Sequence, residues 1–199
     1  MKKFGTTGIV LLFIIAALVL GAKSQISLPS NRSIDVIPAA HAAPGTKEAF
    51  DYLSGQTSSY CSLVPQTVDG YADDQTLQGA CCSAMNYHRY QEQVEGLKKY
   101  NDIPQIPEDP YNISAALAKQ LFAYQQLITL NEQQQAVYDQ AMELSHEGGP
   151  CCCKCWRWSA FEGLAKYLIT KENFDSEQIA DLWDLLDGCG GSGHAGDGH

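Results

Sequence analysis

The spacing of apolar residues in the second half of the chain predicts a series of amphipathic helices. In residues 113–128, apolar side chains recur at intervals of three and four positions, which places them on one face of a helix. Residues 131–146 repeat this pattern, and the segment from Thr129 to Glu132 has the form of a capping box. Because only a short turn separates the two segments, we expect them to form a helical hairpin.

Two further helices are predicted closer to the C-terminus. Residues 157–171 and residues 176–187 both carry apolar side chains with helical period. Asp175 can cap the second of these helices together with Gln178, and Gly188 is placed to end it in the left-handed conformation. Both segments are therefore expected to bury one face in a common core.

A fifth helix is predicted for residues 75–100, followed by an extended connection that contains Pro104, Pro107 and Pro110. Dipeptides typical of β-hairpins and alternating apolar runs are nearly absent from the sequence. The sequence therefore predicts an all-α fold, a small irregular helical bundle with a cysteine-rich loop between two of its helices.

The 199 residues divide into four regions by composition. A basic start followed by roughly 15 apolar residues marks residues 1–23 as a secretory signal peptide or an N-terminal membrane anchor, since a membrane-spanning helix needs about 20. Residues 24–46 are expected to form a flexible linker, residues 47–189 a cysteine-rich helical domain, and residues 190–199 a disordered Gly/His tail. We therefore expect an extracytoplasmic protein, secreted or tethered to the outer face of the cell membrane.

The formal charge of the chain limits its partners. It is −10 overall, and because residues 1–42 carry +3, the remainder carries −13. Repulsion from phosphate groups argues against nucleic acid as a partner, whereas metal cations are attracted. A membrane is expected as a partner only through the N-terminal segment, and the sequence identifies no protein partner. Solubility of an exported protein accounts for the acidity equally well.

Four of the eight cysteines lie within five residues, and they are Cys151, Cys152, Cys153 and Cys155. A Gly-Gly-Pro turn precedes this run and a predicted helix follows it. The thiolates are therefore expected near helix N-terminal amides, which lower the pKa of thiols. The following residues 156–158 (Trp-Arg-Trp) are expected either to shield the site from water or to dock the loop onto the core.

A second group of candidate ligands lies in the predicted helix over residues 75–100. Cys81, Met85 and His88 would share one face of that helix, with Cys82 beside them. Thiolate, thioether and imidazole ligands together suit Cu(I), which we expect as the bound metal. Zinc is the second candidate because four thiolates can close a tetrahedral site. No haem is expected, because the sequence contains no C-x-x-C-H motif.

Some of these residues can also have a purely structural role. Met85 can serve as a core side chain and His88 as a surface histidine. Additional candidate ligands are His146, Cys189, His194 and His199. The tail histidines fit equally well as incidental residues of a disordered segment.

The cysteines are also compatible with disulfide or redox chemistry. An even number of cysteines in an oxidising compartment is typical of disulfide-stapled extracellular domains. Cys152 and Cys155 also form the C-x-x-C pair of thiol-disulfide oxidoreductases, although the strand that usually precedes that motif is missing. Because the sequence contains no acid/base dyad, nucleophile elbow or phosphate loop, we do not expect an enzyme.

The segment from Pro150 to Cys155 resembles the Pro-Cys-Tyr-Cys-Gly-Cys motif of the PCYCGC motif-containing proteins, an exported bacterial family. The proline and the three alternate cysteines, Cys151, Cys153 and Cys155, match that motif. The resemblance covers the last third of the chain and implies a small, extracytoplasmic, metal-handling protein with helices on both sides of the motif. It supports Cys151, Cys153 and Cys155 as ligands.

Together these observations predict a protein that binds a soft metal ion, Cu(I) before zinc, for sequestration or delivery. The alternatives are a disulfide-stapled interaction or structural domain and, second, a thiol-disulfide oxidoreductase.

Overall fold

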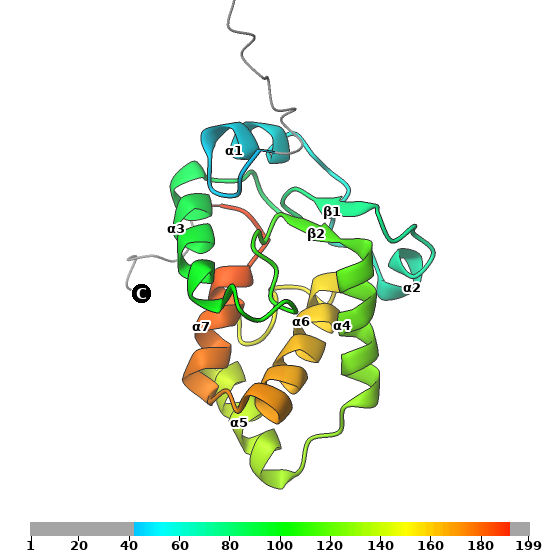
Figure 1. Cartoon of the computed structure of the whole chain (residues 1–199), viewed down its shortest axis with the longest axis vertical. Helices are drawn as coiled ribbons and strands as arrows, with labels where there is room; N and C mark the ends of the chain where they lie inside the picture. The colour runs from blue at the N-terminus through cyan, green and yellow to red at the C-terminus, as the bar shows by residue number, and fades with distance from the viewer. Residues whose placement is uncertain (1–41, 192–199) are drawn as a thin grey trace, which may run out of the picture. The chain divides into compact units, whose positions relative to one another are not determined.

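The computed structural model describes residues 42–191, which form a mainly helical body with one two-stranded sheet (Figure 1). The elements are α1 (Lys47–Leu53), α2 (Pro65–Val68), β1 (Thr76–Gln78), α3 (Tyr87–Leu97), β2 (Asn112–Ser114), α4 (Ala115–Leu127), α5 (Glu132–Leu144), α6 (Trp156–Tyr167) and α7 (Ser176–Leu186). None of the described helices is long and apolar enough to cross a membrane. The predicted signal or anchor segment, residues 24–41 of the predicted linker and the histidines of the tail lie outside the described residues.

The main core lies among the last four helices. In Figure 1, α4 runs alongside α6, and α5 packs against α7, which also contacts α3. Trp156, Phe161 and Leu164 of α6 are almost completely buried in this core. Cys151, Cys155 and Cys189 belong to the same buried cluster. The cysteine-rich loop is therefore part of the core at one end of the bundle.

A smaller core lies under α1. It consists of five buried side chains, namely Ala49, Leu53, Tyr90, Val94 and Tyr111. The Tyr90 ring lies edge-on to the Tyr111 ring, with the ring centres 5.9 Å apart. The Tyr90 hydroxyl donates to the buried carboxylate of Asp109 at 2.6 Å, which satisfies both polar groups.

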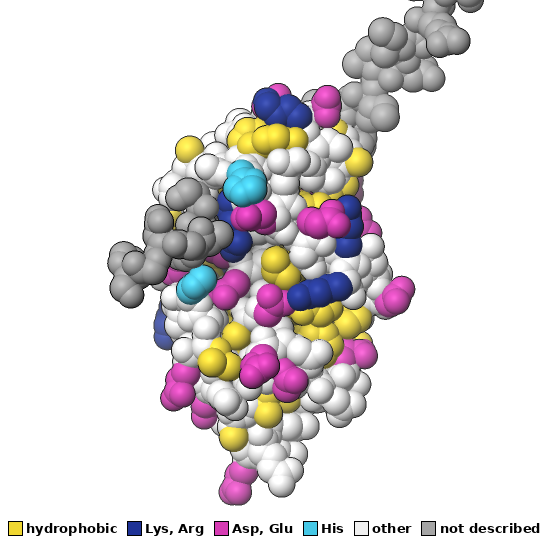
Figure 2. All heavy atoms as spheres, turned by 90° about the vertical axis from the view of Figure 1, so that its left-hand side faces the viewer, with side chains coloured by type: hydrophobic (Ala, Val, Ile, Leu, Met, Phe, Trp, Pro, Cys, Tyr) yellow, Lys and Arg dark blue, Asp and Glu magenta, His cyan; other side chains and the backbone are white. Residues whose placement is uncertain are grey.

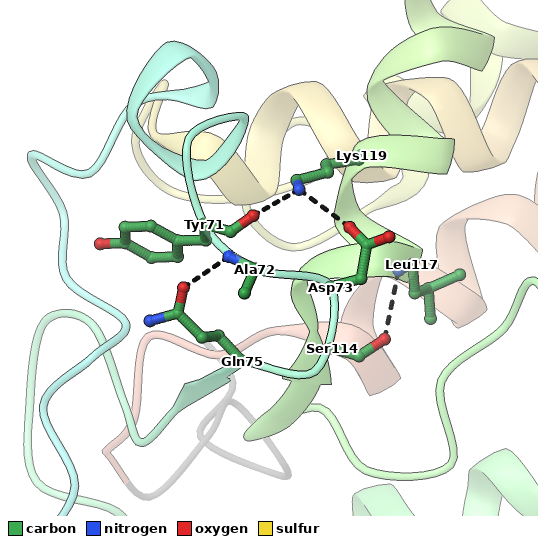
Figure 3. Close-up of polar contacts among 7 residues, drawn as sticks. All are labelled: Tyr71, Ala72, Asp73, Gln75, Ser114, Leu117 and Lys119. Carbon is green, nitrogen blue, oxygen red and sulfur yellow. Dashed lines mark hydrogen bonds and ion pairs between the residues drawn. The ribbon is translucent and has the colours of Figure 1, made fainter.

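The two short strands come from segments far apart in the sequence. In the antiparallel pair, Leu77 stands opposite Ile113, and both side chains are buried. Ser114 ends β2 and caps α4, because its hydroxyl accepts a hydrogen bond from the Leu117 amide at 3.1 Å (Figure 3). The sheet thus fixes the chain before the cysteines at 81 and 82 to the start of α4.

The turn before β1 is held to α4 by one lysine, as Figure 3 shows. Lys119 donates to the Tyr71 carbonyl at 2.5 Å and to the Asp73 carboxylate at 2.9 Å. Within the turn, the Gln75 side chain accepts a hydrogen bond from the Ala72 amide at 2.6 Å. These contacts fix the entry of β1, which needs support because an isolated two-stranded sheet is only marginally stable.

Four of the predicted helices are confirmed as α4, α5, α6 and α7. The capping box of Asp175 and Gln178 at the start of α7 is present as predicted. The predicted helix over residues 157–171 begins at Trp156 and ends in a π-helical turn, Leu168–Glu172. Periodicity located these helices because each has one face in the core.

The prediction of a helix over residues 75–100 is wrong in its first half. Residues 76–78 form strand β1, and the helix α3 begins only at Tyr87. Gly79 has a φ of +85°, and a Cβ there would lie 2.0 Å from the Gln56 carbonyl oxygen, so the chain turns sharply where the helix was expected. Cys81, Met85 and His88 therefore do not share a helix face.

Two predicted helix ends are also corrected. The capping box of α5 is formed by Asn131 and Gln134, two positions later than the predicted pair. The chain leaves α7 at Asp187 with a φ of −58°, and Gly188 is not among the described residues with positive φ. Position 188 requires glycine for a different reason, because a Cβ there would lie 2.3 Å from the guanidinium carbon of Arg157.

Gly163 allows the close approach of α6 to α4, and its replacement tests this contact. A Cβ at this position would lie 1.9 Å from the Leu121 carbonyl oxygen. Helix propensity alone would make Gly163→Ala stabilising by about 1 kcal/mol. We expect instead a decrease of about 1–3 kcal/mol in the free energy of unfolding, measured by urea denaturation, because the two helices must move apart.

The control is Gly55→Ala, where the added Cβ would meet its nearest neighbour at an ordinary 3.6 Å. This variant should change the free energy of unfolding by less than about 0.5 kcal/mol. Equal or higher stability of Gly163→Ala would contradict the close packing of α6 on α4.

Candidate metal centre

All eight cysteines are free thiols, and the fold brings them together from four segments of the chain. Their Sγ atoms form four overlapping groups of three, and within each group the atoms lie within 4.8 Å of one another. The groups are Cys61/Cys81/Cys82, Cys81/Cys151/Cys189, Cys82/Cys152/Cys189 and Cys151/Cys153/Cys155. The eight cysteines thus cluster closely enough to hold a metal ion.

Two cysteines are the centres of this cluster. The Cys82 sulfur lies 2.7 Å from that of Cys61 and 3.6 Å from those of Cys81 and Cys152. The Cys189 sulfur lies 2.7 Å from that of Cys152, 3.8 Å from that of Cys151 and 3.9 Å from that of Cys81. Each of these two sulfurs therefore has three sulfur neighbours, which in both cases come from more than one segment of the chain.

Backbone hydrogen bonds align the segment of Cys81 with the segment after α7. The Cys81 amide donates to the Gly188 carbonyl at 3.0 Å, and the Cys82 amide donates to the Cys189 carbonyl at 3.2 Å. Further along, Met85 and Gly191 form a parallel bridge. Gly190 permits this close pairing, since its φ is +84° and a Cβ there would lie 2.2 Å from the Ser83 carbonyl oxygen.

The cysteine run itself ends on the first turn of α6. Cys155 is the N-cap residue of this helix, and the amide of Trp156 donates to the Leu63 carbonyl at 2.8 Å. That bond holds the segment of Cys61 against the end of the run. The expected location of the thiols at a helix N-terminus is therefore confirmed for this end of the run.

A single buried arginine connects all four cysteine segments. Arg157 has no exposed surface, and its guanidinium donates to the Pro110 carbonyl at 2.7 Å, the Ser59 hydroxyl at 3.3 Å and the Gly79 carbonyl at 3.4 Å. Ser59 and Gly79 each lie two residues before a cysteine of the cluster, and Arg157 lies two residues after another. Gly188, one residue before Cys189, packs directly on the guanidinium.

The charge of Arg157 is not paired with a carboxylate. Its three hydrogen-bond acceptors are neutral, and among residues 42–191 no acidic side chain forms an ion pair with it. The guanidinium also stacks on the Trp156 ring, with 4.8 Å between the guanidinium carbon and the ring centre. A buried cation with neutral hydrogen-bond partners favours anions nearby. The buried Asp109 carboxylate interacts electrostatically with the guanidinium, and thiolates of the cluster can supply further negative charge.

Hydrogen bonds among the thiols divide them into proton donors and acceptors. Hydrogen bonds from Cys151 and then Cys81 lower the pKa of the Cys189 thiol to about 5. The hydrogen bond to Cys155 likewise lowers the pKa of Cys151. Conversely, the pKa of Cys81 is raised, chiefly because its proton is shared with Cys151, and burial raises the pKa of Cys152. Neighbouring thiols therefore stabilise the thiolate form of Cys189 at neutral pH.

One side of the cluster reaches the surface. Cys61, Cys82 and Cys152 are exposed, whereas Cys151, Cys155 and Cys189 are buried. A cleft of about 280 Å³ beside Cys81 and Cys82 is lined by residues 80–85 and by Ser54, Gln56 and Thr57. The cluster therefore extends from the core to an open cleft.

The structure places the other predicted ligands outside the four groups. Met85 lines the cleft next to Cys81 and Cys82 and also packs against the small core under α1. The His88 side chain is 83% exposed, and its Nε2 lies 3.2 Å from a carboxylate oxygen of Glu92 on the same helix. His146 contacts Asp184, with its amide donating to that carboxylate at 3.1 Å. The six cysteines among the predicted ligands are all in the cluster.

Two of the cluster's cysteines have only a weak signal in the sequence. Cys189 is no more than an additional candidate there, and Cys61 is not among the candidate ligands. The one signal is the rarity of cysteine, since an isolated cysteine in an oxidising compartment needs a partner. The role of Arg157 as a connector has no local signal, because its partners lie 47 to 98 residues away.

No family model, curated protein or solved structure matches this chain. The function of the centre is therefore inferred from its own chemistry. Thiolates bind soft and borderline metal ions such as Cu(I) and Zn²⁺.

Proposed function

We propose that this protein is an exported Cu(I)-binding protein that uses the cysteine cluster to sequester the ion or to deliver it to a partner. The observation that carries the proposal is the joining of eight thiols from four segments into one connected cluster. No stability requirement of a domain of this size calls for such a cluster. The resemblance to the PCYCGC motif-containing proteins supports the same proposal through Cys151, Cys153 and Cys155.

The number of sulfur neighbours favours metal over disulfides. A sulfur in a disulfide needs one sulfur partner, whereas Cys82 and Cys189 each have three within 4 Å. A metal–sulfur bond of about 2.3 Å places two thiolates of one site about 3.8–4.0 Å apart. The separations of Cys189 from Cys151 and Cys81, 3.8 and 3.9 Å, have this length. Several contacts are thus spaced as in a metal site.

The number of sulfurs in each group favours Cu(I) over zinc. A structural Zn²⁺ site takes four ligands in a tetrahedron, with its sulfurs about 3.8 Å apart. Among the described residues, every candidate group contains three sulfurs and none contains four. Cu(I) is stable with two or three thiolates, and soft thiolates are the ligands that it prefers.

The electrostatic surroundings also suit a cation held by thiolates. The buried Arg157 supplies a positive charge beside the cluster, and it offsets the negative charge that the thiolates leave after binding a monovalent ion. Acidic side chains outnumber basic ones on the face shown in Figure 2, which favours the approach of cations from solution. A neutral set of disulfides would gain nothing from either feature.

The cleft beside Cys81 and Cys82 supports exchange of the ion with a partner. It leaves exposed thiols at the surface, with the Met85 thioether on the lining of the same cleft. A soft ion can pass between thioether and thiolate ligands without entering water as a free ion. This arrangement favours sequestration or delivery over catalysis.

Disulfide formation is the second candidate, and two contacts favour it. The sulfurs of Cys61 and Cys82 lie 2.7 Å apart, as do those of Cys152 and Cys189. These pairs are too close to serve as two ligands of one ion without moving apart, and close enough to bond on oxidation. These two contacts involve four of the eight cysteines. The two cysteines of the C-x-x-C pair, Cys152 and Cys155, belong to different groups. The cluster therefore gives no support to a redox role for this pair.

Copper binding is tested on the full chain, reduced and handled without oxygen. We expect the protein to take up Cu(I) and to retain it through gel filtration against a weak Cu(I) chelator, as measured by elemental mass spectrometry. Replacement of Cys82 and Cys151 together by serine should abolish retention, because each of the four groups contains one of these two residues. The matched control is His88→Ala, which removes an exposed side chain outside the cluster and should leave retention unchanged. A reduced wild-type protein that retains no copper would refute the proposal, and it would favour the disulfide candidate if its thiols reoxidise quantitatively in air.

Export rests on the apolar segment within residues 1–23 and is tested separately. Residues 1–46 fused to a reporter enzyme that is active only outside the cytoplasm should give an active reporter in a bacterial host. Exchanging two apolar residues of the segment for lysine should abolish the activity, since charges in the apolar run prevent insertion into the membrane. An inactive wild-type fusion would show that the segment does not direct export.

Arg157 should affect both the stability of the fold and the retention of copper. In Arg157→Met the acceptors on Ser59, Gly79 and Pro110 lose their donor, so we expect the free energy of unfolding to fall by on the order of 3 kcal/mol. Loss of the positive charge should also weaken Cu(I) binding by about tenfold or more, equivalent to about 1.4 kcal/mol. Competition with a Cu(I) chelator measures the second effect.

The control is Arg89→Met, which removes a hydrogen bond from α3 to the Asp184 carbonyl but no contact with a cysteine segment. It should lower the stability of the fold and leave the copper affinity unchanged. If both variants weaken copper binding equally, the role assigned to Arg157 is wrong.

A further inference from the structure

We infer that the cluster holds a single polynuclear Cu(I)–thiolate centre, with one ion in each of the four three-cysteine groups. The inference rests on the proposed function, because it specifies how the same eight thiols divide the metal among them.

Four cysteines belong to two groups each, and four belong to one. The shared residues are Cys81, Cys82, Cys151 and Cys189. The residues that belong to a single group are Cys61, Cys152, Cys153 and Cys155. Four separate three-thiolate sites would need twelve cysteines, whereas sharing lets the chain complete them with eight. A thiolate sulfur has several lone pairs, so it can bridge two soft cations.

The shared sulfurs form a continuous chain through the cluster. Cys82 lies 3.6 Å from Cys81, and Cys81 lies 3.9 Å from Cys189, which lies 3.8 Å from Cys151. Two sulfurs that bind one metal ion lie about 3.8–4.0 Å apart. Each of these three sulfur–sulfur distances is close to that value. Ions in neighbouring groups would share these sulfurs and lie close to each other. In the two groups that contain a 2.7 Å pair, Cys61/Cys82 and Cys152/Cys189, binding of an ion would move the exposed Cys61 and Cys152 outward by about 1 Å.

Charge favours several ions over one. If eight thiolates bind one Cu(I), seven negative charges remain, and each must be left uncompensated or neutralised by a proton. Four Cu(I) ions reduce the remaining charge to −4. Three of the cysteines are buried, where unpaired charge is most costly. The buried Arg157 supplies one positive charge toward the remainder. A centre with one ion would also leave five thiols without a ligand role.

The exposed cysteines provide a matched pair of variants. Cys61 and Cys82 are both exposed, lie 2.7 Å apart and share one group, but only Cys82 belongs to a second group. Under the same competing chelator, Cys61→Ser should therefore lose one copper ion and Cys82→Ser should lose two. Circular dichroism of each variant checks that its helices are retained. Equal losses by the two variants would contradict the bridging role of Cys82.

The stoichiometry of the unmodified chain gives a second test that does not depend on any variant. Titration of the reduced full chain with Cu(I), followed by native mass spectrometry, should end at four ions per chain. X-ray absorption spectra of the loaded protein should contain scattering between neighbouring copper atoms, which a mononuclear site cannot give. An endpoint other than four, or four ions without copper–copper scattering, would overturn the inference while leaving Cu(I) binding intact. A chain that binds no Cu(I) would instead refute the proposed function itself.

Discussion

The buried guanidinium of Arg157 is the contact on which the rest of the centre depends. It donates to Ser59, Gly79 and Pro110, it packs on Gly188, and it follows the cysteine run by two residues. Four segments with no local reason to meet are thereby held around one planar, five-donor group. Arginine suits this position because a lysine has only one nitrogen and lacks the rigid fork that reaches three acceptors in different directions.

This arrangement makes the first turn of α6 both a structural and a chemical element. Trp156 and Phe161 anchor the helix in the main core, and Gly163 lets it lie close against α4. Because the helix is fixed by packing, the cysteines at its N-terminus are held in position before any ion arrives. A site built on a rigid element holds its ligands more accurately than one built on a free loop.

The sequence predicts those elements whose structure depends on neighbouring residues. It does not predict the structure of segments that depends on contacts with residues distant in the sequence. Helices α4 to α7 are recognisable because each has an apolar face of helical period, and the box of Asp175 and Gln178 is a local signal. The helix assigned to Leu77 and Cys81 is wrong, because the pairing of β1 with β2 and the turn at Gly79 depend on residues more than 20 positions away. The cysteine run at 151–155 indicates a thiol site. Its contacts with Cys61 and Cys189 arise from the tertiary fold and cannot be predicted from spacing along the chain.

The preformed cluster changes what metal binding must do for the protein. In small zinc domains, the free energy of binding is used to fold the chain, and removal of the ion unfolds it. Here the buried cysteines belong to a core that also contains Trp156, Leu164 and Trp183, and backbone bonds already align Cys81 with Gly188. A bound ion would therefore not need to stabilise the fold, and its affinity would depend mainly on the thiolates and their charge. A soft ion held this way can leave through the open cleft without unfolding the protein, which is the property that a carrier or a store requires.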